Sequence, residues 1–204
     1  MSLSQREIAR YLGYGTAPLP AQVVHYAQQC EAELTAAVTP RSLGRRLSRS
    51  LFAGQSRDLD HHLRHCQEAI LYAVTLGAEA DRLLRRWGAQ NMAKAAVGQA
   101  VCATWLDALC ADYCATLLPE LEPGVFLTAP FSPGYGDWPL EAQRQVLSFL
   151  DAPRRLGLTL TTGGMLAPEK SVTALVGLSD RPEEHCGQRC MRCNKSDCPF
   201  RAGT

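Results

Sequence analysis

The sequence predicts an α+β protein: a helical N-terminal part packed on a small, mostly antiparallel sheet, followed by a cysteine-rich tail. Apolar residues recur at helical spacing through most of the chain up to Leu118. Two short β-branched, apolar runs, residues 156–161 and 172–178, come after a segment rich in proline and glycine and are predicted strands. We therefore expect one domain over residues 1–180 and a metal-binding tail over residues 181–204.

The first two predicted helices each stop at a helix-breaking residue. Residues 3–12 have helical periodicity and precede Gly13, and residues 23–38 have it and precede Pro40. Residues 41–58 contain arginine, serine and glycine with only weak periodicity. We expect that segment to be a basic connector.

Two further helices are predicted before the chain reaches its proline-rich part. Residues 63–77 carry an apolar stripe at helical spacing, formed by Leu63, Cys66, Ile70 and Ala73. A continuation of this pattern reaches Trp87. The longest predicted helix covers residues 89–118 and ends at Pro119, and its alanine-rich face would let neighbouring helices approach closely.

The character of the chain changes after the longest helix. Residues 119–137 hold several prolines and glycines and are predicted to be loop, with one strand at 125–128. Asp137 has the position of an N-cap for a helix that runs to Leu150. The two strands named above then enclose a loop that contains glycine and proline, residues 162–171.

Charge and hydropathy exclude several function classes. The 204 residues include 21 Lys or Arg and 20 Asp or Glu, a balance too even for a protein that binds a phosphate backbone or an anionic membrane. No uncharged apolar span reaches the roughly 18 residues of a membrane helix. Arg6 and Arg10 interrupt any apolar signal sequence. We expect a cytoplasmic protein with no nucleic-acid partner and no membrane partner.

The strongest local signal is a group of thiols in the tail. Four cysteines follow one another at short spacing before Pro199, namely Cys186, Cys190, Cys193 and Cys198. A polar segment of this kind gains its folding energy from a bound metal, and four sulfur ligands suit zinc or a 4Fe-4S cluster equally. The first three thiols have the spacing of a radical S-adenosylmethionine motif, but no barrel follows them and the fourth thiol closes the site.

The other reactive side chains form weaker patterns. His61, His62, His65 and Cys66 are close in sequence, and an exposed polar helix face explains them better than a metal site. The remaining five cysteines are predicted small core residues: Cys30, Cys66, Cys102, Cys110 and Cys114. A phosphate-binding loop is excluded at Lys170, because Glu169 stands where a glycine is needed.

Residues 131–139 combine two glycines and two prolines with aromatic side chains. The flat faces of Tyr135 and Trp138 suit a planar or partly apolar ligand, and the backbone amides of the following helix favour an anionic or carbonyl group. A rigid structural turn is the alternative interpretation.

Residues 131–141 and 165–174 closely resemble the activation domain of cobalamin-dependent methionine synthase. Residues 10–14, residues 75–77 with Asp81, and the end of the tail match the free-standing activation-protein branch of that family, so that the resemblance covers nearly the whole chain. It implies an accessory protein for reductive reactivation: cobalamin in a methyltransferase oxidises to inactive Co(II), and the domain binds S-adenosylmethionine and supports remethylation as one electron arrives. No nucleophile or acid–base pair is apparent in the chain, in keeping with chemistry carried by the partner's cofactor.

The resemblance also implies partners and site residues. The partner would be cobalamin-dependent methionine synthase or another corrinoid protein, with flavodoxin or ferredoxin as possible electron donor. The implied ligand-binding residues are Ser132, Pro133, Gly134, Tyr135, Gly136, Asp137, Lys170 and Ser171. Pro130 stands where the family has an arginine that pairs with the ligand's carboxylate. Either another cation, such as Arg154 or Arg155, substitutes for it, or S-adenosylmethionine binding is lost.

Two other functions therefore stay open at this point. A chain that no longer binds S-adenosylmethionine would be a non-catalytic redox or docking adaptor for corrinoid proteins. A chain whose tail is a plain zinc knuckle would be an interaction module.

Overall fold

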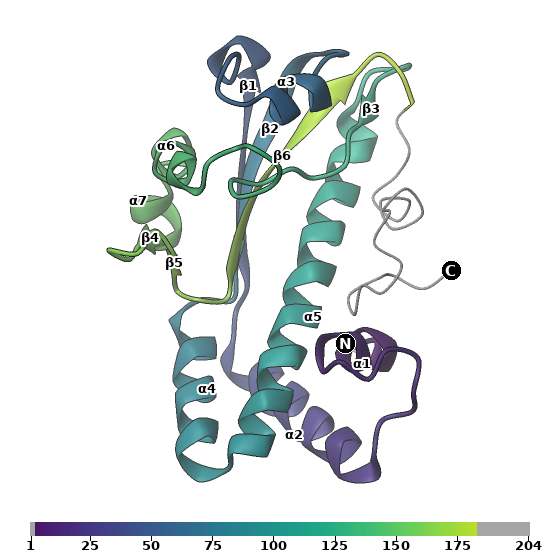
Figure 1. The fold of residues 1–204 in the computed structure, drawn as a ribbon, viewed down its shortest axis with the longest axis vertical. Helices are drawn as coiled ribbons and strands as arrows, with labels where there is room; N and C mark the ends of the chain where they lie inside the picture. Colours follow the sequence, from purple (N-terminus) through teal and green to yellow (C-terminus); the bar gives the residue numbers. More distant parts are fainter. Residues whose placement is uncertain (1–2, 183–204) are drawn as a thin grey trace.

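The computed structural model describes residues 3–182, which form an α+β fold around a four-stranded antiparallel sheet (Figure 1). The four tail cysteines of the predicted metal site lie outside the described residues. The sheet order is β1-β2-β6-β3, and a separate two-stranded sheet pairs β4 with β5. The elements are α1 (Gln5–Tyr11), α2 (Ala21–Ala37), β1 (Arg41–Ser48), η1 (Arg49–Leu51), α3 (Arg57–His62), β2 (Cys66–Thr75), α4 (Ala78–Gln90), α5 (Met92–Leu117), η2 (Leu118–Glu120), β3 (Phe126–Leu127), η3 (Leu140–Ala142), α6 (Gln143–Leu150), α7 (Ala152–Leu156), β4 (Thr159–Leu160), β5 (Leu166–Ala167) and β6 (Ser171–Ser179).

Helices cover both faces of the sheet, and the side chains of β2 alternate between two hydrophobic clusters. Ile70, Tyr72 and Val74 belong to a cluster with α1, α2, α4 and α5. Leu71 and Ala73 belong to a second cluster with α3, α6 and α7. This period of two is that of a strand whose two faces are both buried.

The predicted helix over residues 63–77 is wrong, because β2 occupies most of it. Every residue from Ala69 to Thr75 is buried, since β2 is a central strand with helices on each side. In a continuous apolar run, some apolar residues always fall at helical spacing by chance. Leu63, Cys66, Ile70 and Ala73 are such residues. The helical pattern that we extended to Trp87 is confirmed only as the separate helix α4.

The predicted connector over residues 41–58 is also wrong, because its first half is β1. Leu43 and Leu47 point into the sheet's second cluster while the arginines between them stay at the surface. β1 pairs in full register with β2, from Arg41 opposite Thr75 to Ser48 opposite Glu68. Charged side chains on an edge strand discourage pairing with other chains, and they also hide the strand from a hydrophobicity pattern.

The other predicted elements are confirmed in type, with three corrections. Residues 162–171, predicted to be loop, contain the strand β5, which pairs with β4. Helices α1, α2, α5 and α6 and strands β3 and β6 lie where the sequence indicates. The predicted strand over residues 156–161 is reduced to β4, because α7 extends to Leu156. Asp137 is not the N-cap of the next helix, because Pro139 holds that position before η3. The Asp137 side chain contacts α3 instead.

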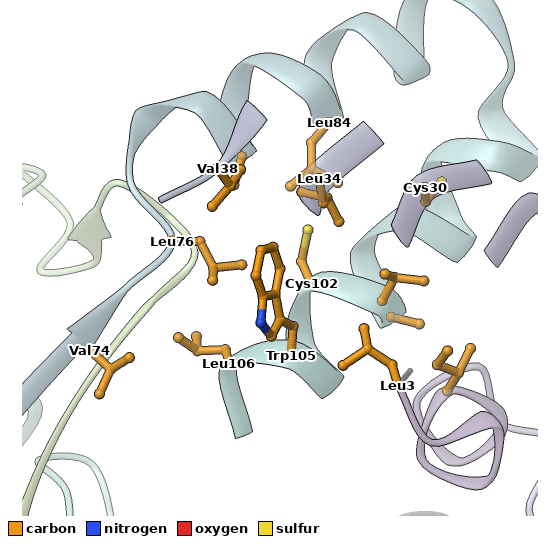
Figure 2. Close-up of a cluster of buried hydrophobic side chains, with 14 of the residues drawn as sticks. Leu3, Cys30, Leu34, Val38, Val74, Leu76, Leu84, Cys102, Trp105 and Leu106 are labelled. Carbon is orange, nitrogen blue, oxygen red and sulfur yellow. The ribbon is translucent and has the colours of Figure 1, made fainter. Parts of the chain in front are cut away.

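The longest helix, α5, packs in the middle of the first cluster (Figure 2). Figure 2 shows Trp105 and Cys102 of α5 among side chains of α2, α4 and β2, including Leu34, Leu84 and Val74. Gly98 lies directly against the ring of Trp87, a contact that leaves no room for a Cβ atom. The expected close approach of neighbouring helices is thus confirmed at this position.

One helix of the described part, Met92–Glu120, is long and apolar enough to cross a membrane by length and composition, with a mean hydropathy of 1.3 over an 18-residue window. Its resemblance to a membrane-spanning helix consists of length and composition alone. In this fold the same helix packs against α1, α2, α4 and the sheet.

A candidate ligand site between α5 and the 128–138 loop

A cavity of about 600 Å³ opens between α5 and the loop formed by residues 128–138. Three parts of the fold contribute its wall. The helical part includes Asp107, Cys110 and Cys114 of α5 and Leu118 of η2. The part from the sheet includes Tyr72, Val172 and Ala174, and the part from the loop includes Thr128, Pro130, Ser132 and Tyr135. Most of these side chains are apolar or carry a single hydroxyl or thiol. The cavity therefore suits a ligand with a sizeable apolar surface.

The loop is held along the free edge of β6 by backbone hydrogen bonds. The N–H of Phe131 donates to the carbonyl of Leu175, and the N–H of Leu175 donates back to Phe131, both at 2.8 Å. One turn later the N–H of Tyr135 donates to the carbonyl of Ser132 at 3.0 Å. Gly134 has a φ of +90°, a conformation open to glycine, and its N–H donates to the carbonyl of Trp138 at 2.8 Å.

This backbone path buries two aromatic rings of the loop and exposes the third. Trp138 and Phe131 are buried in the sheet's second cluster and stack with their ring centroids 6.1 Å apart. The Tyr135 ring is nearly perpendicular to that of Phe131, with the centroids 5.9 Å apart, and Tyr135 keeps 48% of its surface exposed. The expectation that the loop presents flat aromatic faces is met by Tyr135 and not by Trp138.

Helix α3 holds the C-terminal half of the loop through a reciprocal pair of carboxylates. The Asp137 carboxylate accepts hydrogen bonds from the hydroxyl of Ser56 and from the N–H groups of Arg57 and Asp58, at 3.0 and 3.1 Å for the two amides. The Asp58 carboxylate accepts in turn from the N–H of Asp137 at 3.0 Å. The Ser56 hydroxyl and these amides hold the pKa of the Asp137 carboxyl below its ordinary value.

The other end of α3 holds the start of the loop. The His62 ring Nε2 lies 2.8 Å from the carbonyl oxygen of Ala129 and 2.9 Å from the Thr128 hydroxyl, which accepts from the N–H of Gly177. The same ring lies 5.0 Å from that of Phe131. An exposed polar helix face is therefore the wrong interpretation for His62, although His61 is exposed. Within residues 3–182 no group of three or more His, Cys, Asp or Glu is placed to hold a metal ion.

The second resembling motif, residues 165–174, is anchored on the end of β2. The Ser171 hydroxyl lies 2.7 Å from that of Thr75, which accepts from the N–H of Gly77 at 2.9 Å. The Asp81 carboxylate accepts from the N–H of Glu169 at 3.0 Å. The short matches at residues 75–77 and 81 are thus explained by a contact with the longer motif.

A smaller cavity of about 240 Å³ connects the two motifs. Ser132, Pro133 and Tyr135 from the loop line it together with Met165 and Ser171. Ser132 and Tyr135 also line the large cavity, so they stand between the two spaces.

Four of the eight implied ligand residues therefore border these cavities, and four do not: Gly134, Gly136, Asp137 and Lys170 are absent from both walls. The two glycines shape the backbone, and Asp137 is committed to α3. Lys170 is largely buried, with 15% of its side chain exposed, and pairs with Glu169 at 3.0 Å.

The implied arginine has no replacement in the wall of the large cavity. Pro130 lines that wall, and Asp107 is the one charged side chain in the described lining. Its carboxylate accepts a hydrogen bond from Tyr11 and lies 3.5 Å from the Arg10 guanidinium. Arg154 is 85% exposed and pairs with Asp151 at 2.9 Å on α7, and neither it nor Arg155 borders either cavity. The structure therefore gives no support to the suggestion that Arg154 or Arg155 takes the place of the arginine that the family has at position 130.

Sequence reasoning missed the contribution of α5 to the site. Asp107, Cys110 and Cys114 recur at intervals of three and four, so they form one face of the helix. The sequence feature that could have indicated this wall is a stripe of small and polar residues in an otherwise apolar helix. It could not be assigned to a cavity without knowing that the loop lies opposite.

Fold and site together define an α+β domain with a loop-bordered cavity. Among solved structures, this chain is similar to one described as the crystal structure of the MetH reactivation domain bound to AdoHcy. The TM-score is 0.57 at 13% sequence identity, and the match covers 90% of this chain and 79% of that chain. No protein-family model matches the sequence, and no curated protein matches it. The chain therefore has the reactivation-domain fold, as the two sequence motifs indicated.

Proposed function

We propose that this protein is a free-standing accessory protein for the reductive reactivation of cobalamin in methionine synthase or a related corrinoid methyltransferase. One observation carries the proposal. The loop that bears the family resemblance borders a cavity of about 600 Å³ and leaves Tyr135 48% exposed, in a fold similar to that of the MetH reactivation domain. A loop packed solidly inside the protein would have offered no surface to a tetrapyrrole-sized guest.

The residues of the cavity suggest how S-adenosylmethionine would be held. The Tyr135 ring offers a flat face to a planar base, and the hydroxyl of Ser132 offers a hydrogen bond. Asp107 already pairs with Tyr11 and Arg10, and Pro130 gives no help to the ligand's carboxylate. The partner's cobalamin would carry the methyl-transfer chemistry, and this chain would supply placement.

The tail and the location of the protein belong to the same proposal. Cys186, Cys190, Cys193 and Cys198 would hold zinc or a 4Fe-4S cluster in a tail of residues 181–204, separate from the domain of residues 1–180. A cluster would pass an electron, supplied by flavodoxin or ferredoxin, whereas zinc would only fold the tail. We place the protein in the cytoplasm, where such a donor is available.

The experiment measures how fast a Co(II)-inactivated methionine synthase that lacks its own activation domain recovers methyl transfer. Reductant and S-adenosylmethionine are present, and the full chain is added or omitted. We expect the full chain to accelerate recovery, and the variant Tyr135→Ala to lose most of that acceleration while it melts at an unchanged temperature. Recovery at the same rate with and without the protein would refute the proposal.

The absence of a cation from the described lining of the large cavity favours a second candidate, a redox or docking adaptor for corrinoid proteins. Calorimetry with S-adenosylmethionine separates the two. Binding at micromolar concentration would exclude the adaptor, and no binding, together with capture of a corrinoid protein, would favour it.

A further inference from the structure

Two cysteines of α5, Cys110 and Cys114, lie one helical turn apart and both line the large cavity. Both are only partly buried and pack against the edge of the first cluster, whereas Cys30 and Cys102 are fully buried within it. Cys66 is likewise buried, in the second cluster. The two thiols on the cavity wall thus differ from the other three described cysteines by facing a space that a ligand can enter.

The spacing of the two thiols favours a shared ion over a disulfide. Residues four apart on a helix have Cβ atoms about 5–6 Å apart, whereas a disulfide needs about 3.5–4.5 Å. Closing a disulfide between Cys110 and Cys114 would require α5 to distort. Two metal–thiolate bonds of about 2.3 Å each allow the sulfur atoms to remain up to roughly 4.6 Å apart, which an intact helix can supply.

The Cys110 thiol is largely removed from solvent and has Asp107 and Cys114 as electrostatic neighbours. Burial is the main cause that raises the pKa of Cys110 to about 12, and Asp107 and Cys114 contribute to this rise in the same direction. Asp107 is engaged with Tyr11 and Arg10 from α1. A cation that reaches these thiols would therefore meet two sulfur atoms, and the Asp107 carboxylate would not compete with them for the cation.

We propose that Cys110 and Cys114 form a two-thiol site for a soft monovalent ion of the Cu(I) class, open to the large cavity. Thiolates select soft ions, and the described residues contain no group of three or more ligands of the kind that tetrahedral zinc requires. Binding forms two S–Cu bonds and releases two S–H protons to the solvent. The ion keeps its oxidation state, so no electron donor or acceptor is needed.

An ion at this site would protrude into the space opposite Tyr135 and Ser132, which line the same cavity. It would thus compete with any larger occupant. The proposal is independent of the proposed function, since the thiols and the cavity do not depend on what else the cavity binds.

The test is an anaerobic titration of the full chain with Cu(I) against a chromophoric Cu(I) chelator. All variants carry Ser at positions 186, 190, 193 and 198, so that the tail thiols do not compete. We expect one Cu(I) per chain in this background. We expect Cys110→Ala and Cys114→Ala each to weaken binding by roughly 100-fold or more, because a single thiolate remains. Cys102→Ala, a buried cysteine of the same helix, is the matched control and should bind as the background does.

Folding is checked by thermal melting, and alanine suits α5 because it is the best helix former. Absence of Cu(I) binding in the background would overturn the proposal, as would equal binding in either single variant. Zn(II) bound as tightly by the same two thiols would overturn the assignment to a soft two-coordinate ion.

Discussion

Asp58 and Asp137, 79 residues apart in the sequence, each accept a hydrogen bond from the backbone N–H of the other. The bonds measure 3.1 and 3.0 Å, and Ser56 and Arg57 add two more donors to Asp137. α3 therefore fixes the position of the loop that borders the candidate site, and Asp137 contributes through this contact instead of through a ligand.

Asp137→Ala should loosen the loop from α3 without unfolding the domain. The N–H groups of Arg57 and Asp58 would lose their acceptor, and hydrogen exchange of the amides in residues 131–138 should become faster. Glu141→Gln, an exposed carboxylate in the η3 turn that follows, is the control and should leave exchange unchanged. Unchanged exchange in Asp137→Ala would contradict the assigned role.

The same contact should respond to acid. Hydrogen bonds from Ser56 and the α3 amides lower the pKa of Asp137 in the folded state below the ordinary 3.8. A group with a depressed folded pKa stabilises the fold fully above its unfolded pKa and loses that contribution as the pH falls through the folded one. Loop protection should thus stay constant from pH 7 to about pH 5 and decline below about pH 4. Asp137→Asn should flatten this decline, and a decline of the same size in that variant would contradict the prediction.

Gly136→Ala should destabilise the fold more than a comparable glycine substitution. Gly136 has a φ of +53°, and a Cβ atom there would collide with the Asp58 carboxylate. Gly164 has a φ of +77° with open space around it, so Gly164→Ala measures the backbone strain alone, about 1–2 kcal/mol. Urea unfolding should give a larger loss for Gly136→Ala, and equal losses would argue against the steric contact.

Gly44→Ala should destabilise β1 through Tyr113. The Tyr113 hydroxyl occupies the space of a side chain at position 44, and its ring stacks on Tyr72 with centroids 4.9 Å apart. Overpacking of this kind costs about 1–3 kcal/mol. In a Tyr113→Ala background the same substitution should be nearly neutral, and a double-mutant cycle from denaturant unfolding measures the difference. An equal cost in both backgrounds would exclude the contact as the cause.

Tyr135→Ala should weaken S-adenosylmethionine binding by about 10-fold or more, the value of one stacking contact between an aromatic ring and a base. This expectation rests on the proposed function. The melting temperature should hardly change, because the ring is 48% exposed. Met92→Ala, exposed at the remote end of α5, is the control and should bind like the wild type. Calorimetry measures both, and equal affinities would remove Tyr135 from the site.

The fold class and most helices followed from the sequence because their patterns are local. The alanine-rich α5 and the β-branched run of β6 each carry a complete periodic signal. β2 was mistaken for a helix because burial on both faces removes the alternation that marks a strand. β1 was missed because five of its eight residues are polar or charged and only Leu43 and Leu47 face inward.

The site was only half accessible to sequence reasoning for a related reason. Ser132 and Tyr135 could be named because they lie in one short, unusual segment. The roles of Asp137 and His62 depend on contacts across 66 to 81 residues, and no local pattern records them. The α5 side of the cavity required knowledge of which helix face lies opposite the loop.

The backbone pairing of Phe131 with Leu175 has a consequence for aggregation. β6 would otherwise present a row of unsatisfied amides and carbonyls beyond the two residues that β3 covers. The segment that displays Tyr135 thus also shields an edge of the sheet from other chains. A variant that detaches this short stretch from β6 should therefore self-associate.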